Sequence, residues 1–409
     1  MNPYTILLIS VLLQLPVLLK PNLLSRLTIH PNVFIGCIFV IKLASVLLLK
    51  VVYQFYGYDL LGFAEHGNFI LKGLIPAKDY STPYSIMYEY LLFFCCKLYN
   101  DPLSIAIFFL ACEAVVYLQI IRLIPAKSVH MVNTILFTIA TNPLFLFFTI
   151  YDKQDEILLI VLAVSLLFWD RNSKYNFFYA FIAILFTKIL ALLILIPIFK
   201  FKYRQSVYLG LSIVAYFSLM YYSGFTKIFK FEFSRLSGLP DQIYEAITPG
   251  NFWFILNYSF GFSVKVFLPL ATTITTLLLL NIYLFFMTQS TSKKFYLEAL
   301  LCNFLLVMIT YKMTFAYYHW IICIALFLYS LLYLNYSLLS RWIILVYSLS
   351  IAASGIITYS VLSAGPSISH KLSFLFTVYQ LSIVCMTTLL FIFFVYRVDK
   401  NEDTVSLLA

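Results

Sequence analysis

Three stretches of the chain gather side chains that could do chemistry, and the first of them covers residues 56–90. Here Asp59 follows a long apolar run, and Glu65, Asn68 and Lys72 recur at the spacing of one helical face. The pattern predicts an amphipathic helix that lies on a membrane surface. A carboxylate at the start of such a helix can be a general base for a hydroxyl group, or it can be the N-cap of the helix. Both roles stay open for Asp59, because capping also orients a base.

The same stretch is rich in tyrosine, with Tyr80, Tyr84 and Tyr88 on either side of Pro83. Aromatic side chains of this kind could form a rim on which a sugar ring stacks. An aromatic belt at the membrane–water interface explains the same residues. The residues alone therefore leave two interpretations, a substrate rim and an interfacial belt.

The second stretch covers residues 152–156, between two apolar runs. The polar side chains of Gln154 and Asp155 could hydrogen-bond the hydroxyl groups of a sugar. The alternative is that this stretch is a solvated loop whose acids cap the following helix. Its spacing does not fit a transition-metal site, so we expect no metal there.

The third stretch places Lys312 and His319 on either side of aromatic residues, again between two apolar runs. A lipid carrier that leaves as a phosphate needs a cation near the membrane surface, which Lys or His supplies. The alternative is a lysine that snorkels within an aromatic belt. Glu113 stands apart from all three stretches. It lies inside an apolar run, where a charge has to be protonated or paired.

The composition indicates the class of protein in which these residues lie. Of the 409 residues, 63% are hydrophobic and 11% are charged, whereas a soluble chain carries roughly a quarter charged residues. These proportions exclude a soluble domain, a disordered chain and a nucleic-acid-binding protein. The net charge of +10 comes from basic residues scattered through short loops, which is typical of membrane topology. The seven cysteines lie in apolar stretches, and we expect them to be small core residues.

Long apolar runs without an alternating strand pattern predict an all-α fold, a polytopic transmembrane bundle of about 11–13 membrane helices. The two long outer loops, 56–83 and 223–263, are expected to be functional, because long loops in a compact bundle usually are. The apolar runs lie at 4–19, 33–55, 84–99, 103–124, 131–150, 155–169, 175–199, 206–222, 264–287, 295–310, 316–337, 341–362 and 373–396.

Placing the short basic loops on the cytoplasmic side satisfies the positive-inside rule and puts most acidic residues on the outer face. With this threading the run 84–99 cannot span, so we expect a helix that dips in from the outer face. Basic loops then flank both ends of 175–199, which predicts a broken helical hairpin with Lys188 near its apex, lining a cavity. The alternative is one long tilted helix from which Lys188 snorkels.

The order of these features resembles the GT-C superfamily of integral-membrane glycosyltransferases, and within it the polyprenyl-phosphate-mannose-dependent mannosyltransferases of family 87. Asp59 matches the acid of that family's first outer loop, and residues 72–84 match the glycine-, proline- and tyrosine-containing stretch that follows. Residues 153–155 resemble a GQxD-like junction with Lys in place of Gly. Residues 187–188 match a Thr-Lys segment, and residues 312–320 echo a late segment with Tyr in place of Gln and altered spacing.

The resemblance covers residues 33–325 and implies an inverting transferase that moves a sugar, mannose before others, from a polyprenyl-phosphate-linked donor to a lipid or glycan acceptor. It implies an extracytoplasmic active site in the cell envelope, no cofactor and no metal. The chain would be one integral-membrane domain, with an N-terminal helix and loop (1–32), a GT-C-like module (33–222) and variable C-terminal helices (223–409). Asp59 would be the general base. The substrate-binding residues would be Glu65, Tyr80, Tyr84, Gln154, Asp155, Lys188, Lys312 and His319.

The main alternative is a transporter, or a flippase of lipid-linked glycans, with Glu113 and Lys188 along its path. Such a protein should concentrate polar groups at mid-membrane depth, where the threading places little beyond Lys42, Glu113 and Lys188. A polymerase that uses a lipid-diphosphate donor would favour arginines in an outer loop. The threading puts Arg235 there and no other arginine clearly outside.

The threading can be tested with single cysteines introduced into a cysteine-free variant. We expect Ser173→Cys and Gln205→Cys to react from the same, cytoplasmic, side, because both positions flank the predicted hairpin. Labelling of sealed membranes with an impermeant maleimide, before and after permeabilisation, measures the sidedness. Opposite accessibility of the two positions would contradict the hairpin and remove the topological case for Lys188.

Overall fold

The fold is described by a computed structural model. The helices of its described residues match the predicted apolar runs closely: the run 264–287, for example, becomes a helix at Phe267–Met287. No strand occurs among these residues, apart from one isolated bridge between Pro76 and Tyr80, so the helical part of the prediction is confirmed for them. The described residues are 3–20, 29–52, 54, 58–82, 84–123, 129–146, 203–225, 252–260, 267–287, 293–311, 322, 325–326, 328–329, 338–363 and 370–406.

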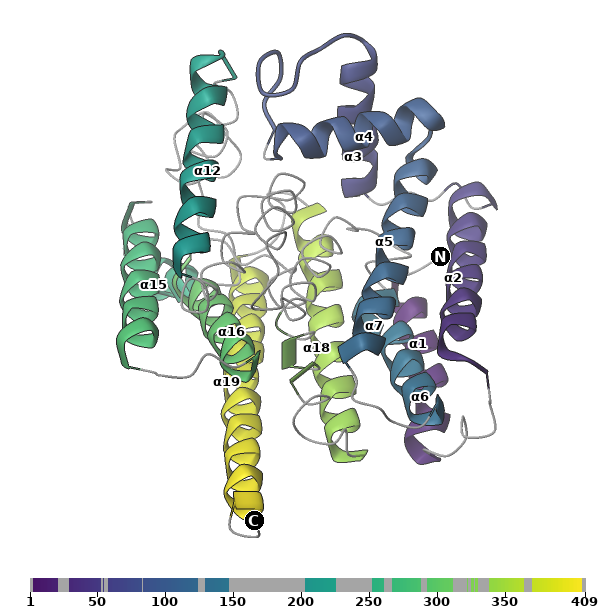
Figure 1. Ribbon diagram of the computed structural model, residues 1–409, viewed down its shortest axis with the longest axis vertical. Coiled ribbons are helices and arrows are strands. Elements are labelled where there is room, and N and C mark those ends of the chain that lie inside the picture. Colours follow the sequence, from purple (N-terminus) through teal and green to yellow (C-terminus); the bar gives the residue numbers. More distant parts are fainter. Residues whose placement is uncertain are drawn as a thin grey trace. The chain divides into compact units, whose positions relative to one another are not determined.

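The chain divides into two compact units, Met1–Glu232 and Phe233–Ala409. Helices of both units are labelled in Figure 1. The first unit contains α1 (Pro3–Leu19), α2 (Pro31–Leu47) with the π-helical turn η2 (Leu48–Val52), α3 (Tyr58–Leu71), α4 (Ile86–Leu98), α5 (Pro102–Leu123), α6 (Val129–Ala140), α7 (Pro143–Leu146) and α12 (Tyr203–Tyr222). The second contains α14 (Phe252–Phe260), α15 (Phe267–Met287), α16 (Lys293–Thr310), α18 (Leu338–Ser363) and α19 (His370–Ser406).

Three of the described helices are long and apolar enough to cross a membrane: Pro31–Val52, Pro102–Arg122 and Thr377–Tyr396. A helix of 21 residues, such as Pro102–Arg122, is about 31 Å long, which matches the roughly 30 Å hydrocarbon core of a bilayer. Helix α4 has 13 residues and is too short to span, as the sequence predicts for this run.

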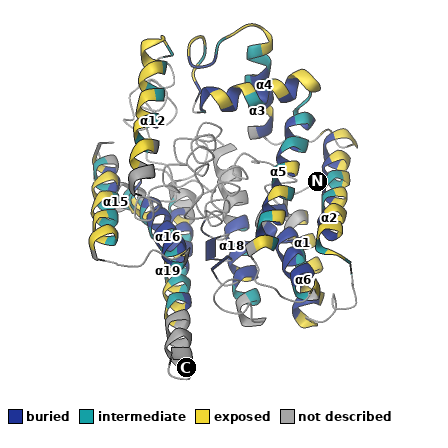
Figure 2. Ribbon diagram, viewed as in Figure 1, coloured by how far each residue is buried: buried dark blue, intermediate teal, exposed yellow. Residues whose placement is uncertain are grey.

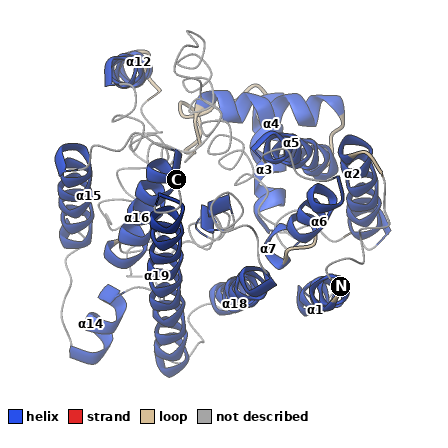
Figure 3. Ribbon diagram, turned by 60° about the horizontal axis from the view of Figure 1, so that its bottom comes forward, coloured by secondary structure: helices blue, strands red, loops and turns tan. Residues whose placement is uncertain are grey.

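Helix α4 lies crosswise over the end of α5 rather than continuing its direction, which Figures 1 and 3 both show. One side of α4 is buried and includes Tyr88, Glu89 and Leu92. The opposite side exposes large apolar side chains, among them Phe94 and Leu98. Figure 2 shows buried and exposed positions along α4. A helix with one face packed on protein and one exposed apolar face suits the interface between the bundle and lipid.

The structure departs from the expected elements at three places. The run 131–150 breaks between α6 and α7, because Pro143 disfavours helical backbone at the residue before it and begins a new helix. The second long outer loop, expected at 223–263, contains the helix α14. Helix α3 begins at Tyr58, so Asp59 lies inside its first turn and is not its N-cap.

The cysteines are also more varied than expected. Cys95 and Cys96 are buried in α4, as predicted, but Cys37 and Cys385 are exposed. Burial raises the pKa of the Cys95 thiol to about 11. The Cys95 thiol is therefore protonated at neutral pH and behaves as a small apolar side chain.

Helix α3 ends in a glycine cap. Gly73 has a φ of 85°, a left-handed conformation that other residues rarely adopt. Its N–H donates to the Ile70 carbonyl at 2.9 Å, and the Leu74 N–H donates to the Phe69 carbonyl at 3.0 Å. These two bonds form a Schellman motif, which satisfies the last carbonyls of the helix and turns the chain toward the loop.

The loop between α3 and α4 is held by side chain to backbone bonds. The Asp79 carboxylate accepts the Ile75 N–H at 2.6 Å. The Ser85 hydroxyl accepts the Tyr88 N–H at 3.2 Å and thereby caps α4. The buried Ala77 of this loop packs against α12. The loop is therefore an ordered connection that fixes the start of α4.

The α3–α4 pair is the most extensive helix contact of the described residues, and Gly67 allows it. A Cβ atom at Gly67 would lie 2.6 Å from the Cys96 Sγ and 2.9 Å from the Leu92 carbonyl oxygen. Real Cβ atoms do not come so close, and a helix carbonyl cannot swing away as a side chain can. The approach of the two helices therefore requires glycine at this position.

The glycine requirement gives a matched test. We expect Gly67→Ala to lower the melting temperature relative to Gly62→Ala by the equivalent of about 1–3 kcal/mol, because overpacking forces the helices apart. Gly62 lies in the same helix, and a Cβ added there would have nothing within 4 Å, so it shares the gain in helix propensity without the clash. Thermal unfolding in detergent measures the difference. Equal melting temperatures would contradict the close approach.

Candidate functional site

A buried carboxylate joins α3, the loop and α4. Glu89 of α4 has no exposed surface. The His66 Nδ1 of α3 lies 2.9 Å from its Oε1 and 3.2 Å from its Oε2. The Tyr80 hydroxyl donates to Oε2 at 3.0 Å, and the Thr82 hydroxyl donates to Oε1. We call these four residues the Glu89 cluster.

The cluster offsets the cost of burying a charged group. An ionised carboxylate without partners is very unfavourable away from water, and three donors here replace the lost hydration. Glu89 also lies in the first turn of α4, where the helix dipole favours a negative charge. Burial, and then the neighbouring Glu89 charge, raise the pKa of the Tyr80 phenol. Tyr80 therefore stays protonated at neutral pH and remains a donor.

Aromatic rings surround the cluster. Tyr84 and Tyr88 stack with centroids 4.6 Å apart, and the Phe63 ring packs edge-on to Tyr84 at 5.5 Å. Tyr88 is 1% exposed, so it is a core residue and cannot belong to a substrate rim, contrary to that expectation. Tyr80 and Tyr84 are half-buried.

The structure brings together some of the residues that the sequence singled out. Tyr80 belongs to the Glu89 cluster and Tyr84 lies beside it, whereas Glu65 is on the exposed side of α3. Asp59 lies in the first turn of the same helix, and its side chain is outside the described part. The remaining candidates also lie outside the described residues, and they are Gln154, Asp155, Lys188, Lys312 and His319.

His66 and Glu89 were missed as site residues. They are separated by 23 positions, so no local motif reveals that they pair. The available signal was indirect: Glu89 is the one acid on a short, mostly apolar helix, and His66 is the one histidine of residues 56–83. If Glu89 had been expected to be buried, a hydrogen-bond donor in a neighbouring helix would have been expected as well, because a buried carboxylate without donors is very unfavourable.

A second buried polar group joins α2 and α5. The Lys42 ammonium forms an ion pair with the Glu113 carboxylate and lies 3.1 Å from the Tyr117 hydroxyl. The Tyr117 hydroxyl also donates to Glu113, one helical turn away. Lys42 and Glu113 are 4% and 0% exposed. Lys42 is thus the partner that the mid-span acid requires, and it comes from 71 positions earlier in the chain.

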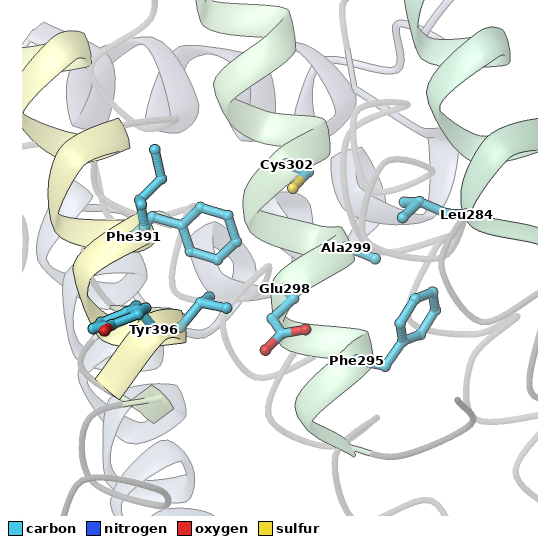
Figure 4. Close-up of a pocket in the computed structure, with 9 residues that line it drawn as sticks. Leu284, Phe295, Glu298, Ala299, Cys302, Phe391 and Tyr396 are labelled. Carbon is cyan, nitrogen blue, oxygen red and sulfur yellow. The ribbon is translucent and has the colours of Figure 1, made fainter. Parts of the chain in front are cut away.

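The second unit contains an apolar pocket of about 450 Å³ between α15, α16 and α19 (Figure 4). Its lining includes Phe295, Cys302 and Phe391, with Glu298 as the acidic group. The Tyr329 hydroxyl donates to Glu298 Oε1 at 2.7 Å, so this carboxylate is already bound. Within the part of the chain that the structure describes, no group of three or more His, Cys, Asp or Glu side chains could hold a metal ion.

Comparison with protein-family models, curated proteins and solved structures finds no match to this chain. The likeness to GT-C glycosyltransferases therefore rests on the order of the sequence motifs.

The α2–α5 ion pair predicts an asymmetric response to mutation. Glu113→Gln should destabilise the protein by about 3–5 kcal/mol, because it leaves the Lys42 ammonium buried without a counter-charge. The double variant Lys42→Met with Glu113→Gln should recover most of that loss, since no buried charge remains. Chemical unfolding in detergent measures both. Lys97→Met is the control, because Lys97 is an exposed lysine.

Additive effects of the Lys42 and Glu113 substitutions would show that the two side chains are not coupled.

Proposed function

We propose that the protein is a membrane glycosyltransferase of GT-C type, built as a polytopic helical bundle. It transfers a hexose, with mannose the first candidate, from a polyprenyl-phosphate-linked donor to a lipid or glycan acceptor on the extracytoplasmic side. One observation carries the proposal. The residues of the predicted first outer loop form a compact unit of α3, an ordered loop and α4, and α3 carries both Asp59, in its first turn, and His66 of the Glu89 cluster.

The proposed sugar transfer needs one general base. An acceptor hydroxyl has to lose its proton as its oxygen attacks the anomeric carbon of the donor. The lipid phosphate leaves as a stable anion, so the departing oxygen needs cations nearby but no general acid. Asp59 at the start of α3 is the proposed base, and the half-buried Tyr80 and Tyr84 supply aromatic surface for a sugar ring.

The donor side of the proposed site comes from the rest of the chain. Lys312 and His319, together with Lys188, would stabilise the departing phosphate by charge-assisted hydrogen bonds. Gln154 and Asp155 would hold hydroxyl groups of the transferred sugar. These assignments follow the motif order of the GT-C resemblance. The chain's own membrane would present the donor, since a polyprenyl phosphate is a lipid.

A transporter is the second candidate, and the buried Lys42–Glu113 pair is the observation that favours it. Intramembrane ionisable residues often mark a transport path. The Lys42 ammonium is, however, already engaged by Glu113 and by Tyr117. Glu113 Oε1 takes part in both the ion pair with Lys42 and the bond from Tyr117, while Oε2 is buried without a hydrogen-bond partner among the described residues. A pair that is engaged in joining two helices has less to offer a cargo than a pair facing a cavity. We therefore place the transferase first.

The central test is Asp59→Asn. This change keeps the size of the side chain and removes the proton acceptor, so we expect a folded protein with at least about a hundredfold lower turnover. Purified protein, radiolabelled polyprenyl-phosphate-mannose and membrane lipids provide the assay. Melting temperature and donor binding are measured in parallel.

The matched control is Asp101→Asn. Asp101 accepts the Leu103 N–H at 2.7 Å at the start of α5, a capping role that Asn fulfils equally well. It should keep near wild-type turnover. An Asp59→Asn variant that folds, binds donor and turns over normally would remove Asp59 as the base. A wild-type protein without any transfer to lipid or glycan would remove the transferase proposal.

A further inference from the structure

The orientation of His66 suggests a specific role for the imidazole. Glu89 accepts hydrogen bonds from Tyr80 and Thr82, so its carboxylate acts as an acceptor throughout the cluster. The His66 Nδ1 facing this carboxylate at 2.9 Å therefore carries a hydrogen and donates. In the neutral ring this leaves a lone pair on Nε2, which makes Nε2 a hydrogen-bond acceptor.

The Nε2 side of the ring is available to a ligand. The His66 side chain is 21% exposed, while its carboxylate partner is fully buried. Among the described residues, His66 makes hydrogen bonds to Glu89 through Nδ1 only. The arrangement is that of a histidine fixed from behind by a carboxylate, with its second nitrogen left for a ligand, as in metal-binding and catalytic histidines.

Aromatic rings enclose the imidazole. Its centroid lies 5.4 Å from that of Tyr80, 6.0 Å from that of Phe69 and 6.2 Å from that of Tyr84. A partly accessible acceptor among aromatic rings suits a ligand with both hydroxyl groups and an apolar face. Ligand sites generally combine aromatic walls with a few fixed polar groups. A sugar has both features, whereas an aliphatic chain lacks the hydroxyl and a phosphate lacks the apolar face.

We propose that His66, held by Glu89, is a subsite for a hydroxyl group of the sugar acceptor, with Tyr80 and Tyr84 as its walls. This inference rests on the proposed function, because it names where the acceptor binds. The acceptor hydroxyl donates its hydrogen bond to His66 Nε2, and no bond of the acceptor changes there. His66 thus positions the acceptor, while the proton of the attacking hydroxyl goes to Asp59.

The helical register separates these two tasks. Positions 59 and 66 of α3 are seven residues apart, which places them on the same face and about 10 Å apart along the axis. Two groups so placed meet different parts of an acceptor. Glu89 acts through His66, so its substitution should loosen the ring rather than remove the hydrogen bond outright.

The kinetic test compares His66→Gln with Lys78→Gln, an exposed lysine of the same outer loop. Loss of one hydrogen bond to the acceptor should raise the acceptor KM about tenfold and leave kcat nearly unchanged. Glu89→Gln should raise KM by less, and Lys78→Gln should leave both constants at wild-type values. A hundredfold fall in kcat at constant KM for His66→Gln would overturn the positioning role. Unchanged constants would overturn the subsite.

A second measurement needs neither a variant nor transfer activity. Diethyl pyrocarbonate modifies accessible neutral imidazoles, and mass spectrometry distinguishes His66 from the other four histidines. In a detergent without a sugar head group, methyl α-mannoside should slow modification of His66, and glycine betaine at equal osmolality should not. If the wild-type protein transfers no sugar, protection by the mannoside would still support the subsite while the transferase proposal fails. Modification at the same rate with and without mannoside would overturn the subsite.

Discussion

A carboxylate without exposed surface has to be met by hydrogen-bond donors, and this requirement at Glu89 organises the segment from α3 to α4. The three donors come from two elements: His66 from α3, and Tyr80 and Thr82 from the loop. Together they fix both α3 and the loop relative to α4. The buried charge is therefore a weak source of net stability but a strong source of specificity, because alternative packings would leave it unpaired.

The geometry of the backbone makes this contact possible. The glycine at position 67 lets α3 approach α4 closely enough for His66 to reach the carboxylate, and the Schellman turn at Gly73 brings the loop back over the cluster. Small residues at helix contacts are common in membrane proteins for this reason. A hydroxyl-binding role for His66 depends on the same constraint, since a loosened α3–α4 contact would free the ring.

The ion pair between α2 and α5 follows the same rule that a buried charge needs a partner. Lys42 and Glu113 lie in helices that are candidates to cross a membrane, where an unpaired charge is costly. Pairing them joins the two helices in a fixed register, and the Tyr117 hydroxyl adds a third contact. The first unit thus contains two buried charged groups that fix helices against one another, one joining α3, the loop and α4 and one joining α2 and α5.

The sequence by itself determined the helical class and most helix limits, because apolar runs and their interruptions are local properties of the chain. It also indicated the short helix within 84–99, which is α4 in the structure. It did not reveal the break before α7, which follows from the effect of Pro143 on the backbone before it. It also did not reveal the helix α14, which is a short apolar segment within the predicted loop 223–263.

Only the tertiary structure decided which polar residues meet. Lys42 and Glu113 are 71 positions apart, and His66 and Glu89 are 23 positions apart, so their pairing depends on how helices pack and not on local spacing. The tertiary structure likewise buries Tyr88 in the core and bonds the Tyr80 hydroxyl to the Glu89 carboxylate, although Tyr80, Tyr84 and Tyr88 look alike in the sequence. The reason is that burial and hydrogen bonding depend on neighbours in space, and one helix alone does not specify its neighbours.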